Sequence, residues 1–229
     1  MGNGMRRGLA LAFLMMLSAC SARPPELPTA PSGPFSLSDP LTRSTAVRLA
    51  ALSRDPGLCR ALLWEVRERF TEVPNSRAGP YCGFTQAVEV SGTPIPYTRN
   101  AKVTCPVAAA LHVWQKEVVI PAARRHFGRE VAAINHYGTY SCRLRNSSRG
   151  KVPSEHASAN AIDIAGFRLS DDRNVTVLKG WNGDRDERAF LREVHQGACH
   201  TFQLVLGPDA DAAHANHFHF DMGEWVACQ

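Results

Sequence analysis

The sequence predicts an α+β domain in which helices flank a small antiparallel sheet and disulfides cross-link the chain. Three observations lead to this prediction. Segments with apolar residues at helical spacing are mixed with short segments that favour strands. Turn-forming residues separate neighbouring strand candidates, which indicates antiparallel pairing. Seven cysteines, with no CxxC pair among them, are typical of disulfides rather than of a thiolate metal site.

Three helices are expected. The longest covers residues 104–128, where Pro106 lies in the first turn and Pro121 should kink the helix. Apolar residues give this helix a continuous buried side, and Gly128 suits its end. Two further helices are expected over residues 57–70 and 186–197.

Five short strands complete the expected fold. Residues 170–174 have the composition of a turn and separate two of these strands, which we therefore expect to pair. The strands are expected over residues 131–137, 161–168, 175–178, 202–206 and 217–222.

The N-terminus has the features of an export signal. Arg6 and Arg7 precede an apolar stretch over residues 9–17 that is too short to span a bilayer. The stretch ends in Leu17-Ser18-Ala19-Cys20, which resembles the lipobox of bacterial lipoproteins. The resemblance implies a signal peptide over residues 1–19 and an acylated Cys20 that anchors the chain to a membrane. The alternative is an ordinary cleaved signal peptide that happens to contain a cysteine. Ser21 favours the outer membrane in bacteria with two membranes.

A tether is expected to follow the anchor over residues 20–44. Six prolines lie between residues 21 and 40, and a stretch of this composition favours extended conformations without a core. The folded domain is therefore expected to span residues 45–229.

Assigning Cys20 to lipid leaves six cysteines for three disulfides in an oxidising compartment. Fifteen pairings are possible, and the spacing does not choose among them. We expect sequential pairs: Cys59 with Cys82, Cys105 with Cys142, and Cys199 with Cys228.

The overall charge argues weakly for an anionic partner. The formal net charge is +5, and the sequence pI is about 9.0. Lys and Arg are nevertheless scattered, without a run of five or more and with few interleaved aromatic residues. Nucleic acid is therefore not expected as a partner.

Two clusters of histidine and aspartate carry the chemistry. His156 and Asp163 form the first cluster, and His214, His217 and His219 form the second. Strand alternation places the side chains of residues 217, 219 and 221 on one face and two phenylalanines on the other. Two imidazoles and a carboxylate from separate segments suit a zinc ion that keeps one coordination position open for chemistry. The chain lacks HExxH and GxSxG motifs, which disfavours a zincin helix or a serine hydrolase.

The spacing of these residues resembles a known group of enzymes. Ser154-x-His156-x-x-Ala159-x-Ala161-x-Asp163 followed by His217-x-His219 is similar to the LAS zinc peptidases: lysostaphin-type endopeptidases, D-Ala-D-Ala carboxypeptidases and murein endopeptidases. The LAS pattern usually has glycine at the position of Ala159.

Nearly the whole exported part resembles the bacterial extensin-like C-terminal domain family more closely still. The segments that carry this resemblance are Cys105-Pro106-Val107-Ala108, Tyr140-Ser141-Cys142-Arg143, Ser154-Glu155-His156, Gly197-Ala198-Cys199, Val205-Leu206-Gly207-Pro208 and His217-Phe218-His219-Phe220-Asp221.

The resemblance to LAS peptidases implies a role for each matching residue. His156, Asp163 and His219 would bind zinc. His217 would act on the attacking water or the developing oxyanion, and His214 matches an accessory histidine of the murein endopeptidases. Arg143 would bind substrate or stabilise charge, although its match is looser.

The expected function is therefore that of a lipid-anchored zinc peptidase that hydrolyses peptidoglycan stem peptides or cross-links. The expected location is the periplasmic side of a bacterial envelope. The rival interpretation is a non-catalytic envelope protein that binds peptidoglycan or a partner and holds a structural metal. The third alternative is a domain that is cross-linked by disulfides and binds no metal.

Overall fold

The computed structural model describes residue 1, residue 27 and residues 33–92, 94–145 and 152–229. Almost all of the predicted signal peptide, Cys20 and most of the tether before residue 33 lie outside the described residues. Among the residues that are described, no helix has both the length and the apolar character that a membrane crossing requires.

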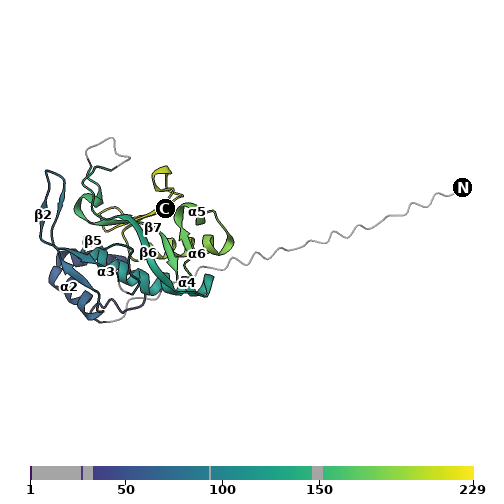
Figure 1. Cartoon of the computed structure of the whole chain (residues 1–229), viewed down its shortest axis with the longest axis horizontal. Coiled ribbons are helices and arrows are strands. Elements are labelled where there is room, and N and C mark those ends of the chain that lie inside the picture. Colours follow the sequence, from purple (N-terminus) through teal and green to yellow (C-terminus); the bar gives the residue numbers. More distant parts are fainter. Residues whose placement is uncertain (2–26, 28–32, 93, 146–151) are drawn as a thin grey trace.

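A six-stranded sheet lies at the centre of the domain (Figure 1). Its strand order is β11-β9-β10-β7-β6, with β8 paired to β7, and all its pairings are antiparallel except that of β11 with β9. This mixture of helices and antiparallel strands confirms the α+β class. The strands are β6 (Val131–Gly138), β7 (Ala161–Leu169), β8 (Asn174–Thr176), β9 (Leu204–Leu206), β10 (Phe218–Asp221) and β11 (Ala227–Cys228).

Two smaller sheets precede the central one, and neither was expected. The first has the order β1-β4-β5, and the second pairs β2 with β3. All of these strands have two to four residues, so their sequence patterns are too short to stand out. They are β1 (Phe70–Glu72), β2 (Ser76–Arg77), β3 (Gly83–Phe84), β4 (Ala87–Val90) and β5 (Ala101–Thr104).

The long helix that the sequence predicts is present as a continuous run of α3 (Cys105–Trp114), a π-helical turn η2 (Gln115–Val119) and α4 (Ile120–Phe127). Every residue of α3 is buried, which makes it the central helix of the core. Pro121 explains the π-helical turn, because its ring crowds the preceding turn and it lacks an N–H for the helical hydrogen bond.

The other helices differ partly from expectation. Helix α2 (Pro56–Glu65) ends five residues early, because Phe70 begins β1 instead. The predicted helix 186–197 is confirmed as α6 (Arg185–Ala198), which Asp184 caps. The predicted strand 175–178 is wrong beyond Thr176, whose side chain caps the short helix α5 (Val177–Gly180). The remaining helices are α1 (Thr45–Ala51), η1 (Leu52–Arg54), η3 (Glu155–Ser158) and η4 (Ala212–His214).

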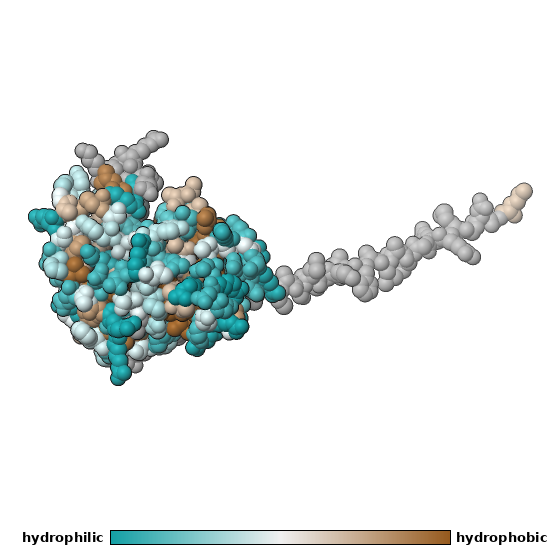
Figure 2. Space-filling model, in the orientation of Figure 1, coloured by the Kyte–Doolittle hydropathy of each residue, from teal (hydrophilic) through white to brown (hydrophobic). Residues whose placement is uncertain are grey.

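The core joins the helices to one face of the central sheet. The Trp114 ring contacts Phe167 and Phe220, and its indole N–H donates to the Val194 carbonyl at 2.8 Å. The core begins earlier than residue 45, because the fully buried Leu37 belongs to it. On the face in Figure 2, apolar residues form small, separate patches within a hydrophilic surface.

The cysteines form three disulfides, two of which differ from the sequential pairs. Cys59 joins Cys105 because α2 packs against α3, and Cys82 joins Cys142 because the β2–β3 loop reaches the segment after β6. The predicted pairs of Cys59 with Cys82 and of Cys105 with Cys142 are therefore wrong. Cys199 with Cys228 is confirmed.

Peptide mapping under non-reducing conditions should recover these three pairs. The Cys59–Cys105 bond closes a sequence separation of 46 residues. Replacing both cysteines by alanine should therefore lower the free energy of unfolding by about 2–4 kcal/mol, measured by urea denaturation. A peptide in which Cys59 is linked to Cys82 would contradict this connectivity.

Gly197 lets α6 approach the π-helical turn closely. A Cβ atom at this position would lie 2.3 Å from Val118 Cγ1, so Gly197→Ala should lower the free energy of unfolding by about 1–3 kcal/mol. Gly57→Ala in α2 is the matched control, because its Cβ would lie 3.5 Å from Asp55 Oδ1. The control should stabilise the domain by about 0.4–1 kcal/mol. Equal effects of the two changes in urea denaturation would refute this packing argument.

Candidate metal centre

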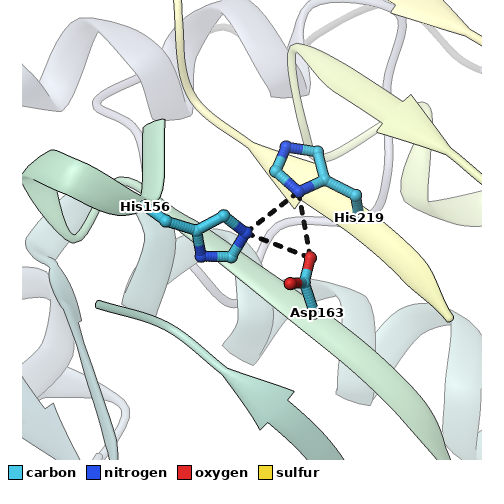
Figure 3. Close-up of side chains that lie close together, drawn as sticks. All are labelled: His156, Asp163 and His219. Atoms are coloured by element: carbon cyan, nitrogen blue, oxygen red, sulfur yellow. Dashed lines mark hydrogen bonds and ion pairs between the residues drawn. The ribbon is translucent and has the colours of Figure 1, made fainter. Parts of the chain in front are cut away.

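Three side chains from two strands and the short helix η3 point toward one another above the central sheet (Figure 3). His156 Nε2 lies 3.1 Å from Asp163 Oδ1 and 3.2 Å from His219 Nδ1, and the latter two atoms are 3.0 Å apart. These are the three metal ligands that the sequence predicts. The structure brings them together as a group that could hold a metal ion.

Strand pairing places two of the three ligands. In the β7–β10 ladder, His219 lies directly opposite Asp163. The neighbouring positions on β10, Phe218 and Phe220, are fully buried on the other face of the sheet. The alternation that the sequence predicts is therefore confirmed, and the same apolar residues that build the core hold the polar ligands on the opposite face.

A short capped loop places the third ligand. Ser154 Oγ accepts a hydrogen bond from the His156 backbone N–H at the start of η3. Ala159 ends this turn with a left-handed backbone (φ +56°), and its carbonyl accepts from the Thr104 N–H at 2.9 Å. Glycine adopts this conformation more easily than alanine. The chain nevertheless keeps the turn with alanine.

Hydrogen bonds on the far side of each ring decide which nitrogen faces the centre. His156 Nδ1 donates to the Thr139 carbonyl at 2.9 Å, so a neutral His156 turns its Nε2 lone pair inward. His219 Nε2 lies 2.9 Å from Asp221 Oδ2 and donates to it, which leaves Nδ1 for the centre. The lone pairs of the two imidazole nitrogens then face one another and the Asp163 carboxylate oxygen. Because these electron-rich atoms repel one another, a positive charge among them is required.

The electrostatics of the ligands agree with this requirement. Burial disfavours the charged form of His219, but hydrogen bonds to Asp163 and Asp221 raise its pKa to about 9. Burial likewise disfavours charged Asp163, but hydrogen bonds from His156 and His219 hold its pKa well below the usual range. A proton and a metal ion would therefore compete for the lone pair of His219 Nδ1.

The predicted catalytic residues surround this group. His217 Nε2 lies 3.5 Å from Asp163 Oδ1, and its Nδ1 lies 2.8 Å from Asn216 Oδ1. Burial lowers the pKa of His217 below its ordinary value, so the ring is neutral near pH 7 and can accept a proton. The His214 ring centre is 5.2 Å from that of His217, and Asp211 orients it through Nδ1 at 2.8 Å.

A cavity of about 190 Å³ opens over the group. Arg143 lines it together with His214, His217 and the two ligands Asp163 and His219. The structure thus gathers all six predicted metal and catalytic residues in one place. The Arg143 carbonyl accepts from the Ser154 N–H at 3.1 Å, next to the antiparallel bridge between Leu144 and Pro153.

A family model described as extensin-like protein C-terminus matches residues 57–229. The chain belongs to this family. The extensin-like domain includes the whole metal-ligand group and its cavity, and this membership confirms the family expected from the sequence. No curated protein and no solved structure matches the chain. The resemblance to LAS peptidases stays a prediction.

Sequence reasoning placed Asp221 on the site face but missed its role. Its buried carboxylate fixes the orientation of His219, and its second oxygen accepts the Gly223 backbone N–H at 2.9 Å. The alternation His217-x-His219-x-Asp221 was the available signal, since residues two apart on one strand face are neighbours. Glu155 also lines the cavity of the extensin-like domain and was likewise missed.

Asp221→Asn should weaken metal binding, because an amide is a poorer acceptor for the His219 N–H than a carboxylate. We expect the affinity for Zn²⁺, titrated against a chelator, to fall about 10–100-fold. Asp209→Asn is the control, since Asp209 accepts from Trp181 and Arg192 outside this cavity. Unchanged affinity in Asp221→Asn would remove Asp221 from the metal site.

Proposed function

We propose that this protein is a lipid-anchored, zinc-dependent peptidase that hydrolyses peptidoglycan stem peptides or their cross-links. One observation carries the proposal: three metal-ligand atoms converge beneath an open cavity that also holds a neutral histidine and an arginine. A purely structural metal site needs no such cavity, because its coordination is closed. The LAS-like spacing of the same residues supports the peptide bond as the target.

The ligand set fits zinc. Ligand–ligand distances of 3.0–3.2 Å are close to the value of about 3.3 Å that tetrahedral bonds of about 2.0–2.1 Å require. His156, Asp163 and His219 would hold the ion and leave its remaining position toward the cavity. When bound, zinc would supply a Lewis acid that lowers the pKa of a water to about 7 and polarises a carbonyl.

His217 is the best placed proton carrier. Asn216 Oδ1 accepts from Nδ1, so the free Nε2 lone pair faces Asp163 and the cavity. The ring would take a proton from the attacking water and return it to the leaving amine. Arg143 would stabilise the developing negative charge or bind a substrate carboxylate, and His214 would support the position of His217.

The N-terminal sequence supports the location. A lipobox-like Cys20 and a proline-rich tether would hold the domain at the membrane surface on the periplasmic side, with the outer membrane favoured. Three disulfides suit that oxidising compartment. Peptidoglycan is the peptide-bearing polymer within reach of such an anchor.

His217→Ala should separate metal binding from catalysis. The variant should retain bound zinc, measured by elemental analysis, because His217 is not one of the three ligands. Its release of soluble muropeptides from purified sacculi should fall about 10²–10⁴-fold. His126→Ala is the control, since His126 pairs with Glu193 between α4 and α6.

The decisive comparison uses a known endopeptidase in parallel. If the zinc-loaded wild-type protein leaves both sacculi and free stem peptides intact while that enzyme cleaves them, the catalytic proposal fails. A non-catalytic role in binding peptidoglycan would then follow if His217→Ala and the wild type bind sacculi equally.

A further inference from the structure

Arg145 lines the cavity and also contacts the C-terminal segment of the chain. It lies two residues after Arg143. Its Nη2 lies 3.4 Å from Glu155 Oε1, and its Nε donates to the Pro153 carbonyl at 3.3 Å. Its guanidinium carbon also lies 5.5 Å from the centre of the Trp225 ring on the C-terminal segment. A cation–π contact therefore joins the cavity lining to the C-terminal segment.

The Trp225 side chain is exposed to solvent although its ring contacts Arg145. Its relative exposure is 66%. It lies just before β11, which pairs with β9, and the disulfide between Cys199 and Cys228 fastens the same segment. The indole therefore lies beside the cavity-lining Arg145, on an anchored part of the chain.

The groups beside the indole are planar and polar. The Glu155 carboxylate oxygens accept from Arg145 and from Asn160 Nδ2 at 2.8 Å, and each oxygen has a second lone pair that can accept a further hydrogen bond. A pyranose ring matches this arrangement, because it has a flat C–H surface and a rim of hydroxyl groups that both donate and accept. An apolar peptide side chain fits less well, since it cannot donate to the remaining lone pairs of the Glu155 carboxylate and would remove them from water.

We propose that Trp225, Arg145 and Glu155 form a subsite for a saccharide ring of the glycan strand. This inference rests on the proposed function, because it places the glycan next to the stem peptide that enters the cavity. Trp225 packs against the ring, Glu155 accepts from its hydroxyl groups, and Arg145 holds the indole and the carboxylate in place. The protein then recognises stem peptides that are still attached to glycan.

Binding to glycan strands stripped of their stem peptides tests the subsite directly. The purified full-length protein should bind such strands in a sedimentation or calorimetric assay. Trp225→Ala should weaken this binding about three- to tenfold, and Trp225→Phe should retain most of it. Trp64→Ala is the matched control and should bind as the wild type does. Trp64 is 63% exposed, and it packs on Phe70 rather than beside Arg145.

Two results would overturn the subsite: absence of glycan binding by the wild type, or equal binding by Trp225→Ala and the wild type. If the wild type binds free stem peptides rather than stripped glycan and Trp225→Ala loses that binding, these residues hold peptide instead. Hydrolysis of glycan-free stem peptides by the wild type tests the peptidase proposal separately. Glycan binding that depends on Trp225 in a protein without hydrolysis would keep the subsite and reject the peptidase.

Discussion

The register between β7 and β10 is the constraint on which the site depends. Pairing His219 with Asp163 puts both ligands on one face and places Phe218 and Phe220 in the core. A shift of β10 by one residue would exchange these faces, so that imidazoles would enter the core and phenyl rings the cavity. The free energy of burying the two phenylalanines therefore also maintains the geometry of the candidate metal ligands.

The imidazole rings of His156 and His219 must also have the correct orientation. Hydrogen bonds to groups outside the ligand set fix this orientation. The Thr139 carbonyl and the Asp221 carboxylate hold the outer nitrogens of His156 and His219. Each inner nitrogen is consequently left without a proton of its own in the neutral ring. The arrangement would be unfavourable without a cation or a shared proton, because lone pairs and a carboxylate would face one another in a buried place.

Local sequence patterns correctly predicted the elements that depend on interactions between residues close together in the chain. Alternation around His217 and His219, the cap at Asp184 and the apolar residues before Gly128 all led to correct elements. The disulfides of Cys59 and Cys82 were wrongly paired, because they depend on how α2 packs on α3 and where the β2–β3 loop lies. Thr176 was also misread, because its side chain caps α5. The strand expected over residues 175–178 therefore ends at Thr176.

The site residues could be predicted because motif spacing reflects their shared face, and the same alternation was a signal for Asp221, whereas other groups around the site leave no such signal. Thr139 acts through its backbone carbonyl, so its side chain leaves no signal in the sequence. Arg145 and Trp225 are far apart in the chain, and their contact depends on how the segment after β6 and the C-terminal segment fold.

The bond between Cys82 and Cys142 has a consequence for when the cavity becomes complete. Cys142 directly precedes Arg143, so this cross-link fastens the cavity lining next to Arg143. In a reducing cytoplasm the thiols would stay apart and the lining would lack this attachment. Under the proposed export and hydrolysis, newly made chains would leave the ribosome with an unfinished cavity and acquire its final shape only after secretion, which would protect the cell from hydrolysis in the wrong place.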